Sequence, residues 1–210
     1  AGRLRGPDQP RALEDLKAEA DNLRSAWRRI VQTRQISDLQ RAALGYFLFH
    51  DILSRFSEGS EVFREGADAV SGALVDRTAI PGDAALQELF RAFEGWFMRF
   101  ADPCECATKI EEASDRLEDL PYCWESSVVA VLRVNAYRRA VPASLMPSLQ
   151  RALEFHRLAE DEWGMALTLD SMRFLASASS PDDAEEYARR CLAGFRRIRD
   201  PWGISLALFA

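Results

Sequence analysis

The chain has 210 residues, of which 48% are hydrophobic and 29% charged, so it can bury a substantial core and does not have a disordered composition. Its formal net charge of −6 argues against sequence-independent binding to nucleic acid, because neutralising phosphates requires a basic face. No apolar run approaches the roughly 18–20 residues of a membrane span, and the polar start lacks the pattern of a secretory signal. We therefore expect a cytoplasmic protein that does not contact a membrane.

Proline and polar clusters divide the chain into segments with helical periodicity, and no window shows the two-residue alternation of a strand. The first predicted helix covers residues 10–34. The others follow in chain order at 38–56, 58–76, 84–101, 103–120, 122–140, 142–160, 162–178, 181–199 and from 201 onward.

Trp124, Trp163 and Trp202 are spaced 39 residues apart, and each opens a similar segment. These segments read CWESSVVAVL, EWGMALTLDS and PWGISLALFA. A fixed period of this length is typical of repeat proteins, in which one helix pair stacks on the next. We interpret the three tryptophans as structural residues at the repeat junctions, and contact with a ligand is the alternative.

One face of the second helix in each predicted pair carries a small residue at the same register. The position is occupied by Gly66, Ala113, Ala152 and Cys191. A small side chain there lets the neighbouring helix approach closely, and a larger one would push the helices apart.

These patterns predict an all-α fold, a right-handed superhelical solenoid of about five antiparallel helix pairs. The whole chain 1–210 is predicted to be one repeat domain. Its parts are an N-terminal helix within 1–36, helix pairs at 37–80, 81–120, 121–160 and 161–199, and the start of a truncated further repeat at 200–210.

A metal site would need four ligands in compact tetrahedral geometry. The available side chains are Cys104, Cys106 and Cys123, with His50 or His156. Cys106 falls on the predicted packing face and both histidines lie in other repeats, so we expect no metal and reduced, free thiols.

The acidic pairs of the chain are expected to serve as solvated faces and helix starts. Asp182 and Asp183 follow Pro181, where the helix dipole favours negative charge, and Ser180 is the predicted N-cap. No nucleophile, base and orienting group come together in the pattern, so we expect neither catalysis nor a cofactor.

Four segments resemble a known family. AEADNLRSAW (18–27), FSEGSEVFREGADAV (56–70), DEWGMALTL (161–169) and DPWGISLAL (200–208) are similar to motifs of long tetratricopeptide-type repeats in large bacterial signalling proteins. The resemblance is to the helical sensor region of STAND-class signal-transduction ATPases, which include transcriptional activators. The resemblance implies an NTPase and a winged helix upstream. This chain has no Gly-x-x-x-x-Gly-Lys-Ser/Thr phosphate loop, so by itself it is not expected to hydrolyse nucleotide. Val134 and Arg173 depart from the family, which often has glycine at their position.

The resemblance also implies a binding surface, because the first helix of each tetratricopeptide pair lines the concave groove. The candidate binding residues are then Asn135, Arg138, Asp170 and Phe174. Asn135 and Arg138 have the chemistry to hold a carboxylate or a backbone amide. The alternative, that these residues are solvated and bind nothing, stays open.

We therefore expect a non-catalytic sensor or scaffold module of a larger bacterial signalling or transcription-regulatory ATPase. Its partner would be a protein or peptide, or a small-molecule effector. The alternative is a free-standing adaptor of the tetratricopeptide type that assembles protein complexes.

Overall fold

The computed structural model describes residues 2–76, 82–137, 142–177 and 179–209. The secondary structure in these ranges is helical and includes no strand, which confirms the predicted all-α class. The elements are η1 (Gly2–Leu4), α1 (Gln9–Ala18), α2 (Ala20–Gln32), α3 (Ile36–Ile52), α4 (Phe56–Val75), α5 (Asp83–Met98), α6 (Pro103–Glu118), α7 (Trp124–Ala136), η2 (Ala143–Leu145), α8 (Met146–Leu158), α9 (Glu162–Ala176), α10 (Pro181–Ile198) and α11 (Pro201–Phe209).

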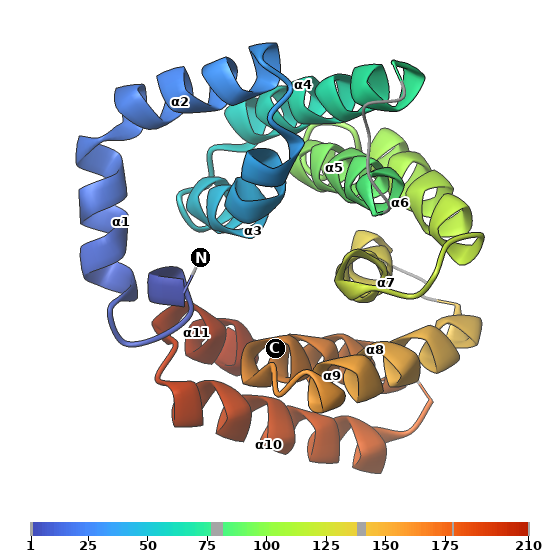
Figure 1. The fold of residues 1–210 in the computed structure, drawn as a ribbon. Coiled ribbons are helices and arrows are strands. Elements are labelled where there is room, and N and C mark those ends of the chain that lie inside the picture. The colour runs from blue at the N-terminus through green and yellow to red at the C-terminus, as the bar shows by residue number, and fades with distance from the viewer. Residues whose placement is uncertain (1, 77–81, 138–141, 178, 210) are drawn as a thin grey trace.

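The helices follow one another around a ring, and the first and last elements lie side by side (Figure 1). Helices α3 and α7 lie on the inner side of this ring, whereas α1, α2 and α10 form part of its outer wall. A hydrogen bond of 3.2 Å from Gln40 Nε2 to Glu125 Oε1 joins α3 to α7. Each helix also packs on the next one in the chain, so most of the core is formed by sequential neighbours.

Aromatic side chains fill the core between α3, α4 and α5. Phe47 stacks on Phe93 with ring centroids 4.2 Å apart, and Phe63 stacks on Phe97 at 5.8 Å. The small residue predicted at position 66 avoids a steric clash, since a Cβ on Gly66 would lie 2.9 Å from the Phe90 ring. The equivalent residues Ala113, Ala152 and Cys191 are all fully buried.

Among the described residues, four helices end in the same way, with a non-glycine residue in the left-handed region. These residues are Arg34, Ser54, Glu160 and Arg199, with φ between 50° and 55°. In each case the following amide donates to the carbonyl five residues earlier, as Asp161 does to His156 and Asp200 to Phe195. This is a Schellman-type termination, and it recurs at a 39-residue offset between Glu160 and Arg199.

The helices that follow these two terminations also begin alike. The carboxylate of Asp161 accepts a hydrogen bond of 3.1 Å from the Gly164 amide, and that of Asp200 accepts one of 3.0 Å from the Gly203 amide. Each carboxylate therefore caps the first turn of its helix, α9 or α11.

An aromatic ring lies over each of the two glycines. A Cβ on Gly164 would overlap the His156 ring, and a Cβ on Gly203 would overlap the Phe195 ring. One period earlier the equivalent residues are Leu117 and Glu125. In this earlier copy Glu125, which has a Cβ, takes the place of the glycine, and Leu117 takes the place of the aromatic ring.

The tryptophans of the predicted junctions pack differently from one another. Trp163 is buried, and its ring stacks on that of Trp202 with centroids 6.3 Å apart and an interplanar angle of 22°. Trp124 and Trp202 are partly buried. All three side chains contribute to the hydrophobic core.

The N-terminal segment closes the ring against the start of α11 (Figure 1). The Gln9 amide donates to Asp200 Oδ1 at 3.0 Å and accepts from the Trp202 backbone amide at 3.0 Å. Arg5 adds a 3.5 Å ion pair to Asp161 and lies 5.5 Å from the centroid of the Trp163 ring. Residues at opposite ends of the chain thus share one junction.

The prediction of one continuous helix over 10–34 is wrong. The backbone leaves the helical conformation at Glu19, with φ of −102° and ψ of 13°, and α1 and α2 run in different directions (Figure 1). No proline or glycine breaks the segment. The bend instead serves tertiary packing, because it lets Gln9 reach Asp200 while the Trp27 indole donates to the Val62 carbonyl at 3.1 Å.

Ser180 is the N-cap residue of α10, as predicted, but its side chain forms no capping hydrogen bond. Asp182 and Asp183 do lie in the first turn, where the helix dipole favours their charge. Among the described residues, no helix is both long enough and apolar enough to cross a bilayer.

Candidate functional site

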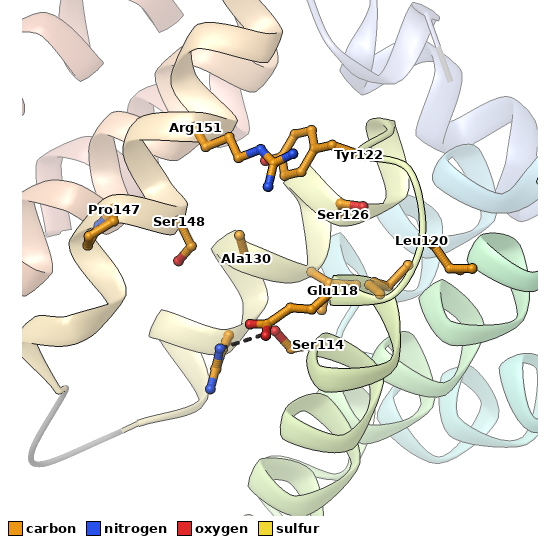
Figure 2. A pocket seen from close by; sticks show the side chains of 12 residues that line it. Ser114, Glu118, Leu120, Tyr122, Ser126, Ala130, Pro147, Ser148 and Arg151 are labelled. Carbon is orange, nitrogen blue, oxygen red and sulfur yellow. Dashed lines mark hydrogen bonds between the residues drawn. The ribbon is translucent and has the colours of Figure 1, made fainter.

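A polar cleft of about 480 Å³ lies between α6 and α8, with α7 between them (Figure 2). This is within the size range of small-molecule sites. We call it the α6–α8 cleft. The side chains that give it polar character are Ser114, Glu118, Tyr122, Ser126, Arg133, Ser148 and Arg151.

Tyr122 and Arg151 face each other at one end of the α6–α8 cleft (Figure 2). The Arg151 guanidinium lies 4.1 Å from the centroid of the Tyr122 ring, which also meets the Phe155 ring edge-on at 5.6 Å. The stack fixes the Tyr122 ring and leaves the edges of the guanidinium free, because a cation over an aromatic face binds through the π-system.

The hydroxyl of Tyr122 is buried and has no hydrogen-bond partner among the described residues. Burial raises the pKa of Tyr122 to about 12, although the nearby Arg151 charge acts in the opposite direction. The phenol therefore stays protonated near neutral pH and remains an unused donor. Arg151 is exposed and forms no ion pair within the described ranges.

Arg133, on α7, also lines the α6–α8 cleft and is bonded to α6. It forms an ion pair with Glu111 and donates a hydrogen bond of 3.2 Å to Ser114 Oγ, drawn dashed in Figure 2. Burial acts to lower the pKa of Arg133, but the hydrogen bond and charge of Glu111, together with the charges of Tyr137 and Asp115, outweigh it and the net shift is upward. The buried Nε–H has no acceptor among the described residues.

The remaining polar groups of the α6–α8 cleft divide into satisfied serines and one free acid. Ser126 Oγ accepts from the Cys123 amide at 3.4 Å, and Ser148 Oγ donates to the Leu145 carbonyl at 2.8 Å. Glu118 is exposed beside Ser114 and has no ion-pair partner in the described part of the chain. Tyr122 and Arg151 therefore lie at one end of the cleft, and Glu118, Ser114 and Arg133 lie at the other.

A second cavity, of about 560 Å³, lies between the N-terminal elements η1, α1 and α2 and helix α3. Its lining is mostly apolar and includes Leu4, Leu16, Leu23, Tyr46 and Phe49. The charged side chains at this cavity include an exposed 2.8 Å ion pair between Arg3 and Asp15.

Three of the predicted groove residues lie within the described ranges, and two of them are used inside the protein. The Asn135 amide donates to Val131 O and to Ser171 Oγ, both at 2.9 Å, and so joins α7 to α9. Asp170 is buried and accepts from the Arg173 guanidinium at 2.9 Å. Burial raises the pKa of Asp170 despite this partner. Phe174 is partly buried, and Arg138 lies outside the described residues.

Tyr122, Arg133 and Arg151 are not among the binding residues predicted from the sequence. They come from the loop before α7, from α7 and from α8, and no motif spacing relates them. The Tyr122 ring packs against α8, and its buried hydroxyl is left without a partner among the described residues. A sequence pattern does not report whether a buried hydroxyl has a partner.

Both histidines are buried, as are Cys106 and Cys191, whereas Cys123 is partly buried and Cys104 is exposed. His50 is buried against Tyr46 and Phe49, and its pKa is lowered to about 4, mainly by burial. His156 Nδ1 lies 3.2 Å from Asp161 Oδ2. The cysteines are free thiols, and the described residues include no group of three or more potential ligands placed to share a metal ion.

Comparisons with family models, curated proteins and solved structures found no match to this chain.

Proposed function

We propose that this chain is a non-catalytic binding module of the tetratricopeptide-like class, a right-handed superhelical array of helix pairs. The observation that carries the proposal is the junction that recurs after 39 residues. At both copies a left-handed residue ends one helix, an aspartate caps the next, and a glycine lies under an aromatic ring. A unit that ends and restarts identically builds an extended surface by repetition, and such surfaces bind partners.

The state of the thiols and phenols supports a role without catalysis. Burial raises the pKa of Cys123, and it raises the pKa of Cys191 to about 12. A nucleophile needs the opposite, a lowered pKa or an adjacent base that removes its proton. The raised pKa values of these two thiols are therefore explained by burial.

We further propose that the module is the sensor arm of a cytoplasmic STAND-class ATPase, as the resemblance of its repeat segments suggests. A protein, peptide or small-molecule effector would bind the array. The effector would bind one arrangement of the helix pairs more tightly than another and so shift the equilibrium toward the first. That shift would change the activity of the ATPase.

The test is to express the complete open reading frame that contains these residues and to measure its ATP hydrolysis during a screen of metabolites and peptides. We expect a phosphate-loop domain in the same protein and hydrolysis that changes with an effector bound to the array. An open reading frame that encodes helical repeats alone would overturn the ATPase role and favour the adaptor.

A further inference from the structure

We propose that the α6–α8 cleft binds a small ligand through a carboxylate or phosphate group that accepts hydrogen bonds from Tyr122 and Arg151 (Figure 2). This inference deepens the proposed function, since it names a ligand class for the binding module. It places the site on α6, α7 and α8, away from the predicted groove residues Asp170 and Phe174 on α9.

The first step of the argument is the set of unused donors. Buried polar groups in folded proteins nearly always have a partner, so each exception needs a reason. In the α6–α8 cleft the Tyr122 hydroxyl and the Arg133 Nε–H are both buried without one. Arg151 adds an unpaired guanidinium beside Tyr122. An anion at this end of the cleft would supply acceptors for Tyr122 and Arg151.

The second step is the chemistry of the donors. A guanidinium presents several N–H groups in one plane, which matches the oxygens of a carboxylate or a phosphate. The phenol stays protonated and therefore donates to the same anion. Because Arg151 comes from α8 and Tyr122 from the loop before α7, an anion bound by both would bridge two elements of the cleft.

The third step limits the charge of the ligand. Glu118 places an unpaired carboxylate at the other end of the cleft, and the whole chain has a net charge of −6. Both disfavour a polyanion. The cleft therefore suits a ligand with one anionic group at the Tyr122 end and a hydrogen-bond donor toward Glu118.

The experiment uses three matched probes, benzoate, phenyl phosphate and benzamide. The ¹⁵N-labelled chain is titrated with each, and dissociation constants are obtained from backbone amide shifts. We expect benzoate or phenyl phosphate to shift the amides of Tyr122, Ser126 and Arg151. Benzamide should bind at least about tenfold more weakly, because it lacks the charge that strengthens these hydrogen bonds. Which of the two anions binds more tightly identifies the preferred group.

Two variants test the assigned donors. Arg151→Gln should weaken anion binding about tenfold, and Tyr122→Phe severalfold, because each removes one donor to the anion. Both should fold, since Arg151 is exposed and the Tyr122 hydroxyl has no partner to lose. The matched control is Arg157→Gln on the same helix, where the exposed Arg157 pairs with Glu154, and it should leave binding unchanged.

The inference is overturned if neither anion shifts these amides, if benzamide binds as tightly as benzoate, or if both variants bind like the parent chain. These outcomes are separate from those of the ATPase test. An anion that binds the cleft in a protein without effector-dependent hydrolysis would support the site and refute the sensor role. Effector-dependent hydrolysis in a protein whose cleft binds no anion would support the sensor role and refute the anion site.

Discussion

The indole N–H of Trp163 donates a hydrogen bond of 2.9 Å to Asp200, which lies 37 residues further along the chain. Asp200 is fully buried and also accepts from the Gly203 amide and from Gln9. One carboxylate therefore caps α11, anchors the preceding tryptophan and holds the N-terminal segment. A buried carboxylate is stable only when its acceptors are satisfied in this way, so the junction depends on all three donors.

Replacing Trp163 tests this junction directly. Trp163→Ala should lower the free energy of unfolding by about 3–5 kcal/mol, because it removes a large buried ring and one donor to Asp200. Trp163→Phe keeps much of the packing and should cost about 1–2 kcal/mol, since a buried acceptor loses its bond. Urea unfolding followed by circular dichroism measures both.

The control for this series is Phe209→Ala, because the Phe209 side chain is 92% exposed. Its effect should stay within about 0.5 kcal/mol. A loss below about 1 kcal/mol for Trp163→Ala would contradict the junction role and would instead fit an aromatic residue that is free to bind a ligand.

A methyl group on Gly203 should be poorly tolerated, because it would overlap the Phe195 ring. We expect Gly203→Ala to destabilise the chain by about 1–3 kcal/mol, the usual cost of overpacking. Leu117 and Glu125 occupy the equivalent positions two periods earlier and suggest a compensating change. There, leucine stands in place of the aromatic ring and the glycine is absent. Adding Phe195→Leu to Gly203→Ala should therefore recover part of the loss.

A double-mutant cycle in urea gives the coupling between Phe195 and Gly203, which should be about 0.5–3 kcal/mol for residues in contact. Gly2→Ala is the matched control, because a Cβ there meets nothing within 4 Å. Additive effects of Phe195→Leu and Gly203→Ala would show that the ring and the glycine do not constrain each other.

Much of this fold could be predicted from the sequence because its signals are local. The helical periodicity of α3 to α11, the helix starts at Pro103, Pro181 and Pro201, and the 39-residue spacing all lie within one or two helices. The bend at Glu19 could not be predicted, since no local breaker causes it. It depends on the contact between Gln9 and Asp200, which are 191 residues apart.

The candidate site was missed for a related reason. The groove residues Asn135 and Asp170 were chosen by their place in a repeat, and both form hydrogen bonds within the protein. The importance of Tyr122 and Arg151 lies instead in hydrogen bonds that the fold leaves unmade. Whether a donor lacks a hydrogen-bond partner depends on three-dimensional packing, so the periodicity of the sequence cannot predict it.

Glycine at the helix terminations should stabilise the chain. Glu160 has a φ of 53°, a conformation that costs a side chain with a Cβ about 1–2 kcal/mol. Glu160→Gly should remove this strain, but glycine also increases the entropy of the unfolded chain, which offsets part of the gain. The net increase in the free energy of unfolding should be about 0.5–1 kcal/mol. Thermal unfolding measures the gain. Arg157→Gly, inside α8, is the contrasting variant and should destabilise by about 1 kcal/mol. Destabilisation by both changes would contradict the prediction.

Acid should destabilise the chain through His50. Its pKa is lowered from 6.5 to about 4, mainly by burial and also by Arg55, so the unfolded state binds the proton more readily. The contribution of neutral His50 to stability is therefore fully present above pH 6.5 and is lost as the pH falls toward 4. The loss due to His50 should be about 2 kcal/mol at pH 5 and should approach about 3 kcal/mol below pH 4.

The variant that isolates this effect is His50→Phe, because the ring lies among Tyr46, Phe49 and Phe97 and a phenyl group suits the same packing. Urea unfolding at pH 7.5 and pH 5 gives the pH dependence of each chain, and carboxylates contribute equally to both. We expect the parent chain to lose about 2 kcal/mol more than the variant over this interval. Equal losses would mean that His50 is protonated in the folded protein, which would require the aromatic pocket around it to admit water or an acidic partner.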